Sequence, residues 1–165
     1  MFLPIKGKPP RLARVFQVYD SPVYFVTFCT LHRQPIIANE RVHAAFRAYS
    51  ERGLQEHHIA VGRYVIMPDH IHLFICGGQT FDLGLWVRGL KRPLAKAVAA
   101  GTAAATTPAG TEKIWQPGFF DHLMRSSESY AEKWEYVRRN PVRALLVSRV
   151  EDWLFQGEIV PLDHF

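Results

Sequence analysis

The sequence predicts an α+β fold in which a four-stranded antiparallel sheet carries helices on one face. Three observations lead to this prediction. Short segments rich in β-branched and aromatic residues are interspersed with longer amphipathic segments, in the order strand, helix, strand, strand, helix, strand, helix. Two of the strands flank Pro68-Asp69, which suits the middle of a tight hairpin turn. The length of 165 residues fits one domain with a single core.

The chain enters the fold through one strand and one helix. Segment 22–30 (PVYFVTFCT) has the composition of a strand. Asn39 is a good N-cap for a helix over 40–53, whose apolar residues recur at helical spacing. Gly53 is expected to end this helix.

A hairpin and a second helix follow. Segments 58–67 and 70–76 read as strands on either side of Pro68-Asp69, and we expect them to pair with each other. The next helix is predicted over 81–100. Pro93 lies inside it and is expected to kink or divide it, because a mid-helix proline removes one backbone hydrogen bond.

The last strand and helix complete the predicted fold. Segment 114–125 reads as a strand with an irregular entrance at Pro117-Gly118, and a helix is predicted over 128–140. Pro141 ends or kinks that helix, and 142–147 can resume as a further turn. The resulting βαββαβ core is the ferredoxin-like arrangement, here with an added C-terminal helix.

We expect residues 1–165 to form one domain with three less regular parts. Residues 1–14 carry four basic side chains among prolines and are predicted to be a basic arm. Residues 101–112 are small and polar, as in a flexible loop, and the tail at 148–165 has no clear pattern.

The net charge of +5 favours a polyanionic partner, because clustered lysines and arginines release counterions from phosphate backbones when they bind. The alternative is a mildly basic protein without such a partner. The start of the chain lacks the continuous apolar stretch of a signal peptide, and no apolar run approaches the ~18 residues of a membrane span. We therefore expect a cytoplasmic protein without a membrane partner.

His70 and His72 stand one residue apart at the start of a predicted strand. Side chains at i and i+2 of a strand point to the same face, so the two imidazoles are presented together while Ile71 points to the other face. Such a pair is a preformed bidentate metal site. The alternative is that both are ordinary polar residues beside a hairpin turn.

Tyr136 and Asn140 are four residues apart, so on a continuous helix they leave the same face. Two imidazole nitrogens and one amide oxygen would hold a divalent ion and leave positions open for water and a phosphate oxygen. Tyr136 would then be the nucleophile. Alternatively, Tyr136 packs the helix on the sheet and Asn140 is a helix C-cap before a proline.

Three segments in this order resemble a known family. They are 67-MPDHIH-72, 115-WQPGFFDHLMR-125 and 136-YVRRNPVRALLV-147. Together they are similar to the REP-associated tyrosine transposases, which belong to the His-hydrophobe-His (HUH) single-tyrosine transposases of insertion sequences. The resemblance runs over most of the chain, from the strand at 22 to the WLF near 153.

The resemblance implies an enzyme that cuts and rejoins single-stranded DNA beside hairpins through a 5′-phosphotyrosine. It implies His70, His72 and Asn140 as ligands of a divalent metal, Mg²⁺ or Mn²⁺, and Tyr136 as the nucleophile. It implies single-stranded or hairpin DNA as the partner and leaves both a monomer and a homodimer open. Two departures are Asp69, where asparagine is frequent, and the absence of a glycine that often follows Arg143.

A further set of basic and aromatic residues is a candidate for DNA contact. Basic side chains can follow a phosphate backbone and aromatic rings can stack on unpaired bases. Alternatively, the basic residues form a solvent-exposed face without a partner, and the aromatic residues belong to the core. The basic members are Arg88, Lys91, Arg92, Lys96, Arg138, Arg139 and Arg143, and the aromatic members are Trp115, Phe119 and Phe120.

Rival interpretations remain for the nucleophile and for the function. Tyr130 is a second candidate nucleophile, but six residues before Tyr136 it would lie well off the face shared with Asn140. The chain could also be a hairpin-DNA-binding protein that no longer cuts. A third alternative is an unrelated metal hydrolase that uses the histidines with a carboxylate, Asp69 or Asp121.

Overall fold

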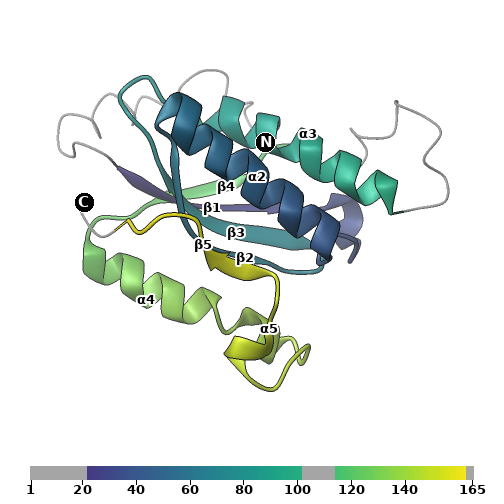
Figure 1. The fold of residues 1–165 in the computed structure, drawn as a ribbon. Helices are drawn as coiled ribbons and strands as arrows, with labels where there is room; N and C mark the ends of the chain where they lie inside the picture. Colours follow the sequence, from purple (N-terminus) through teal and green to yellow (C-terminus); the bar gives the residue numbers. More distant parts are fainter. Residues whose placement is uncertain (1–21, 102–113, 163–165) are drawn as a thin grey trace, which may run out of the picture.

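The computed structural model describes residues 22–101 and 114–162. A five-stranded antiparallel sheet in the order β4-β1-β3-β2-β5 separates two layers of helices (Figure 1). The strands are β1 (Val23–Cys29), β2 (Ala60–Ile66), β3 (His70–Cys76), β4 (Phe120–Leu123) and β5 (Gln156–Glu158). The helices are α2 (Glu40–His57), α3 (Leu83–Ala100), α4 (Ser127–Val137) and α5 (Asn140–Arg143), with single 3-10 turns η1 (Leu31–Arg33) and η3 (Val150–Asp152).

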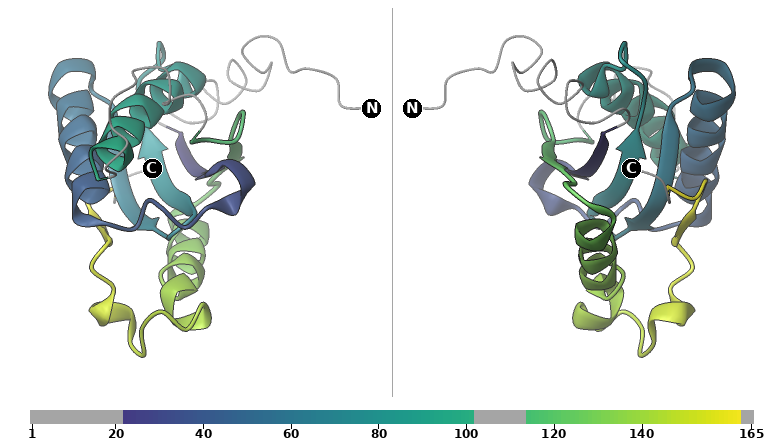
Figure 2. Two further views of the ribbon diagram at one scale, coloured as in Figure 1. Left: turned by 90° about the vertical axis from the view of Figure 1, so that its right-hand side faces the viewer. Right: turned by 90° about the vertical axis from the view of Figure 1, so that its left-hand side faces the viewer.

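The sheet buries a different apolar cluster on each face. Helices α2 and α3 cover one face, while α4 lies on the other (Figure 2). The alternation of strand side chains produces this division: Ile71 and Leu73 of β3 pack with α2 and α3, whereas Phe74 packs with Tyr130 of α4. The predicted α+β fold with a ferredoxin-like βαββαβ core is confirmed.

The hairpin between β2 and β3 forms as predicted, and its turn places the two histidines. The backbone N–H of Met67 donates to the carbonyl of His70 at 2.8 Å, which closes the turn through Pro68-Asp69. The sequence pattern did not predict β5. This strand comes from the tail and pairs with the free edge of β2.

Helix α2 runs four residues past its predicted end. The side chain of Asn39 accepts a hydrogen bond from the N–H of Val42, so the predicted N-cap is confirmed. Gly53 is buried inside the helix, which ends at His57 with His58 in the left-handed region. A Cβ at Gly53 would lie 3.3 Å from Nε1 of Trp86, so the glycine lets α2 approach α3 closely.

Helix α3 is continuous, contrary to the expectation that Pro93 would kink or divide it. Leu90 and Leu94 are fully buried on either side of the proline. Their burial against the sheet outweighs the loss of one backbone hydrogen bond. The cap is the side chain of Asp82, which accepts from the N–H of Leu85.

The last two predicted elements are shorter than expected. The regular strand β4 covers only Phe120–Leu123 of the predicted 114–125, and Trp115 joins β1 through an isolated bridge to Thr30. The predicted helix 128–140 ends at Val137, and α5 is a separate short helix. Pro141 has no N–H to donate to the carbonyl of Val137, which explains the break.

Several expectations concern residues that are not described. The basic arm at 1–14 lies outside the described residues, and so does the predicted loop at 101–112 apart from Gly101. In the two described ranges, no helix is long and apolar enough to cross a membrane.

Candidate active site

His70 and His72 lie side by side at the start of β3, on the sheet face that α4 covers. Their ring centroids are 4.7 Å apart and the ring planes are nearly perpendicular, at 81°. Ile71 between them is fully buried under α2 and α3, as the strand alternation predicts. The two imidazoles are therefore held by a strand whose other face is anchored in the core.

Each imidazole has one nitrogen fixed by a neighbour. Nδ1 of His70 lies 2.6 Å from a carboxylate oxygen of Asp69, and Nδ1 of His72 lies 2.7 Å from the hydroxyl oxygen of Thr27. The Asp69 carboxylate accepts a hydrogen bond from Nδ1–H, and the Thr27 hydroxyl is able to do the same, so in this tautomer each Nε2 keeps its lone pair. This is the orientation that metal-binding histidines adopt in proteins.

Arg33 supports this arrangement from the segment after β1. Its Nε donates to the second carboxylate oxygen of Asp69 at 2.7 Å, and its Nη2 lies 3.3 Å from Nδ1 of His70. His32 and Arg33 have φ angles of 54° and 56°, in the left-handed region that non-glycine residues seldom occupy. The local backbone thus turns Arg33 toward the histidine pair.

The electrostatic environment keeps the two histidines neutral. Burial lowers the pKa of His72 to about 3, and repulsion from His70, when that ring is protonated, and from Lys133 acts in the same direction. Burial also lowers the pKa of His70, although Asp69 opposes that shift. A neutral imidazole is the form that can donate a lone pair to a metal.

Tyr136 and Asn140 lie on opposite sides of the break between α4 and α5. Tyr136 stands in the last turn of α4 with 63% of its surface exposed, and Asn140 begins α5. A common face for Tyr136 and Asn140 requires one continuous helix, and the helix is interrupted between them. Arg143 connects the two residues instead: its guanidinium carbon lies 4.1 Å from the centre of the Tyr136 ring, and its Nη2 donates to the amide oxygen of Asn140.

Arg143 also relates this pair to the histidines. Its positive charge contributes to the lowered pKa of His72, so its guanidinium lies within electrostatic reach of β3. The predicted residues His70, His72, Tyr136 and Asn140 thus belong to one side of the sheet, with Arg143 among them.

The donor set fits a divalent metal that takes nitrogen and oxygen ligands. Two Nε2 atoms are available from one strand, and Asn140 offers an amide oxygen. Within 22–101 and 114–162, no three residues among His, Cys, Asp and Glu are grouped to hold an ion.

The rival residues are placed elsewhere. Tyr130 is only 5% exposed and packs edge-on against Phe74 at 4.5 Å, as expected for a core tyrosine. Asp121 pairs with Val26, whose side chain belongs to the cluster under α2 and α3, so its carboxylate lies on the face away from the histidines. Asp69 is engaged with His70 and Arg33.

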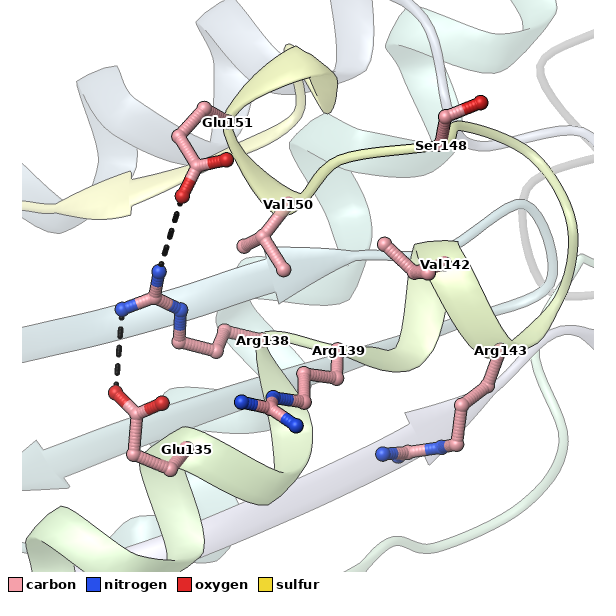
Figure 3. Close-up of a pocket in the computed structure, with 8 residues that line it drawn as sticks. All are labelled: Glu135, Arg138, Arg139, Val142, Arg143, Ser148, Val150 and Glu151. Carbon is pink, nitrogen blue, oxygen red and sulfur yellow. Dashed lines mark hydrogen bonds and ion pairs between the residues drawn. The ribbon is translucent and has the colours of Figure 1, made fainter.

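Three predicted arginines surround a cavity of about 400 Å³ beside the break between α4 and α5 (Figure 3). Arg138 forms ion pairs with Glu135 at 3.1 Å and with Glu151 at 3.4 Å, so its charge is largely neutralised. Arg139 is exposed, and its guanidinium lies between those of Arg138 and Arg143 in Figure 3. Arg139 and Arg143 are therefore the better placed of the three to meet a phosphate.

The basic residues of α3 lie in the other helical layer. Arg88, Arg92 and Lys96 are exposed on α3, across the sheet from the histidines. Lys91 donates to the carbonyls of Gln116 and Gly118, at 3.1 and 2.6 Å. Lys91 thus fixes the entrance to β4, and the structure separates the α3 residues from the group around Tyr136.

The predicted aromatic residues have different surroundings. Trp115 is 7% exposed, packs on Phe28 and donates its Nε1–H to the carbonyl of Lys91, so its ring belongs to the core. Phe119 is half-buried against the same cluster. The exposed aromatic residue here is Phe120, at 60%.

Sequence reasoning missed the residues that orient the histidines. Thr27 reaches His72 because β1 and β3 pair in a particular register, which one sequence does not reveal. Arg33 depends on left-handed backbone at a site without glycine or asparagine to signal it. For Asp69, the only signal was its position directly before His70.

Comparison with known proteins gives relatives in two bacteria. A REP-associated tyrosine transposase of Escherichia coli (strain K12) is 28% identical over 97 residues, which are 58% of this chain and 52% of that protein. A putative REP-associated tyrosine transposase of Haemophilus influenzae is 24% identical over 152 residues, 86% of each chain. The chain spans about half the length of the first two curated relatives it matches.

Two solved structures have a similar fold. A REP-associated tyrosine transposase bound to a REP hairpin superposes with a TM-score of 0.63 and 22% identity, covering 82% of this chain and 75% of that one. A putative transposase from Deinococcus radiodurans has a TM-score of 0.50 and 17% identity, covering 81% and 95%. At these identities the likeness concerns the fold.

The match to a family profile covers more than half of the sequence. Residues 18–140 match the family described as "Transposase IS200 like", a range that begins before β1 and reaches Asn140 at the start of α5. It includes the histidine pair, Thr27, Arg33 and Tyr136. The chain therefore belongs to the IS200-like transposase family.

Proposed function

We propose that this chain is a metal-dependent transposase that cleaves and rejoins single-stranded DNA beside hairpins through a 5′-phosphotyrosine on Tyr136. Family membership supports a transposase, and the similar fold of a relative solved with a REP hairpin supports hairpin DNA as the partner. The proposed metal ligands are His70, His72 and Asn140.

One observation carries the proposal. His70 and His72 each have Nδ1 held by an oxygen atom, so both present Nε2 on the face of the sheet that α4 covers, and Tyr136 is exposed at the end of α4. A pair of ordinary surface histidines would not require two separate oxygen partners and a supporting arginine.

The chemistry follows from the phosphodiester, whose negative charge repels a nucleophile. A bound divalent metal would neutralise charge on the nonbridging oxygens. The Tyr136 hydroxyl oxygen forms a bond to phosphorus, its proton passes to solvent, and the 3′ oxygen of the preceding nucleotide leaves and takes up a proton. The product is a 5′-phosphotyrosine and a free 3′-OH, and a second 3′-OH reverses the step to join strands.

Arg143 suggests a second candidate function. It contacts the Tyr136 ring and donates a hydrogen bond to the amide oxygen of Asn140, so the proposed third ligand is already engaged in this arrangement. A hairpin-DNA-binding protein without catalytic activity would keep the hydrogen bond between Arg143 and Asn140. The transposase, in contrast, requires Arg143 to release Asn140 when the metal binds.

The test uses end-labelled single-stranded hairpin DNA with the full-length protein and Mn²⁺, analysed on a denaturing gel. We expect a covalent protein–DNA adduct with the wild type that disappears in Tyr136→Phe and when EDTA removes the metal. Tyr130→Phe is the matched control, because it removes the hydroxyl of the other tyrosine of α4 and should leave the adduct unchanged.

The outcomes separate the two functions. If no protein forms an adduct while wild type and Tyr136→Phe both shift the hairpin in a native gel, the chain is a binding protein. If Tyr136→Phe still cuts and Tyr130→Phe does not, the assignment of the nucleophile is wrong.

A further inference from the structure

Phe120 lies in the same cross-strand row as His72. The register pairs Phe120 of β4 with Thr27 of β1, and Thr27 with His72 of β3. Paired residues point to the same face of a sheet, so all three lie on the face of the histidine pair. With strands spaced ~4.8 Å apart, Phe120 and His72 are about 10 Å apart at the backbone.

The ring of Phe120 has no place in the core. It is 60% exposed, although it lies on a strand, and it belongs to neither buried cluster. Among the strands of the described residues, β4 is at the edge of the sheet, so none of them lies beside Phe120 on the side away from β1. The sheet therefore presents an open aromatic face one strand away from the histidines.

One cationic side chain lies a row away from Phe120 on the same face of the sheet. In the next row of the sheet, Phe25 stacks on the ring of His72 at 5.4 Å and 18°, and the ammonium of Lys133 lies 5.1 Å from the Phe25 ring centre. His122, which pairs with Phe25, is exposed beside Phe120. A positive charge from α4 thus lies over Phe25, one row of the sheet away from Phe120.

Isolated exposed apolar residues are common and carry no meaning by themselves. Leu154 and Leu85 are comparably exposed, at 74% and 59%, but Leu85 lies on α3 in the other layer. Phe120 differs because it shares a sheet row with a proposed metal ligand and has Lys133 nearby. An apolar protein partner would not be matched by these cations, whereas a nucleic acid has both flat bases and phosphates.

We propose that Phe120 is the stacking platform for an unpaired base of single-stranded DNA, two strands across the sheet from the proposed metal ligand His72. This inference rests on the proposed function and adds to it a residue that positions the strand. The edge of β4 would receive the base, while Lys133, over Phe25 in the next row, would face the phosphate backbone.

The experiment scans 2-aminopurine along the unpaired segment of a hairpin oligonucleotide bound to full-length Tyr136→Phe in EDTA, so that neither cleavage nor metal is involved. We expect fluorescence at one position to fall on binding, because stacking on an aromatic ring quenches the analogue. Adding Phe120→Ala should abolish that change and weaken binding roughly 5- to 100-fold. Phe120→Trp should preserve both, and Leu154→Ala is the control for removal of an exposed apolar side chain.

Two results would overturn the inference, and they differ in what they mean for the proposed function. If Phe120→Ala binds as tightly as its parent and leaves the fluorescence profile unchanged, while the otherwise wild-type protein forms the Tyr136 adduct, stacking on Phe120 is wrong and the transposase stands. If no variant binds the oligonucleotide and no adduct forms, both proposals fail.

Discussion

Asp69 shares its two carboxylate oxygens between His70 and Arg33, at 2.6 and 2.7 Å. Burial tends to raise the pKa of Asp69, but its hydrogen bond and charge interaction with His70, together with Arg33, lower it overall. The ionised carboxylate accepts from Nδ1–H of His70 and so selects the tautomer whose Nε2 is free. At the scale of single residues, the histidine pair is prepared by three neighbours: Asp69, Arg33 and Thr27.

Replacing Asp69 should therefore weaken metal binding without touching a proposed ligand. We expect Asp69→Ala to lower Mn²⁺ affinity by about 10- to 100-fold, the usual effect of losing a group that orients a ligand. Asp69→Asn should have a smaller effect, because its amide oxygen can still accept from Nδ1–H. Isothermal titration calorimetry on the full-length protein measures both.

Asp152→Asn is the control, since Asp152 is an exposed carboxylate on η3. Wild-type affinity in Asp69→Ala would mean that the contact with His70 has no part in metal binding.

At the scale of elements, the break between α4 and α5 determines how the proposed nucleophile and third ligand meet. Val137, at the end of α4, is 2% exposed in the cluster beneath the sheet and anchors the turn that carries Tyr136. Helix α5 starts separately at Asn140, with Pro141 as its second residue. The two short pieces are joined through Arg143, whose one side chain contacts both Tyr136 and Asn140.

Arg143→Ala is expected to reduce the rate of adduct formation by about 10- to 100-fold, because small displacements of reacting groups have effects of this size. Arg143→Lys should not restore the rate, since an ammonium lacks the planar fork that can cover a ring and reach an amide together. Single-turnover adduct formation on labelled hairpin DNA measures the rate.

Arg149→Ala is the matched control: Arg149 is exposed and its contact with Glu151 is long, at 3.8 Å. A faster rate in Arg143→Ala would show that Arg143 blocks Asn140 instead of positioning Tyr136.

At the scale of the whole molecule, the sheet and its two helical layers followed from patterns that one sequence contains. Strand composition, the Asn39 cap and the Pro68-Asp69 turn predicted β1, α2 and the β2–β3 hairpin, and the alternation in β3 predicted that His70 and His72 share a face. These are local signals, because residues close together in the sequence determine the secondary structure and the face to which each side chain points.

The sequence-based predictions were wrong where contacts between residues far apart in the sequence determine the structure. Helix α2 continues through Gly53 because Trp86 of α3 requires a close approach, and α3 continues through Pro93 because both adjacent turns are buried. The strand register that brings Thr27 and Phe120 into the row of His72 is also tertiary information. A single sequence lists these residues without showing that they meet.

The stability of the metal-free protein should fall as the pH decreases below about 6.5. Burial lowers the pKa of His43, whose Nε2 lies 2.8 Å from the Tyr64 hydroxyl, and His72 has a pKa lowered to about 3. Because the unfolded histidines bind protons at higher pH than the folded ones, acid favours the unfolded state. The stabilisation is complete above the unfolded pKa of about 6.5 and is lost as the pH falls toward the folded values.

Urea denaturation in EDTA between pH 8 and 5 measures how the free energy of unfolding depends on pH. The variant His43→Gln isolates the contribution of His43 to that dependence. We expect the variant to be less stable than the wild type at pH 8, because glutamine does not reproduce the ring packing of His43 on Tyr64 and Phe155. Its free energy of unfolding should nevertheless change less between pH 8 and 5, since one proton-linked group is gone. An equal decrease in both proteins would mean that His43 titrates alike in the folded and unfolded chains, and that the acid sensitivity originates at the histidine pair on β3.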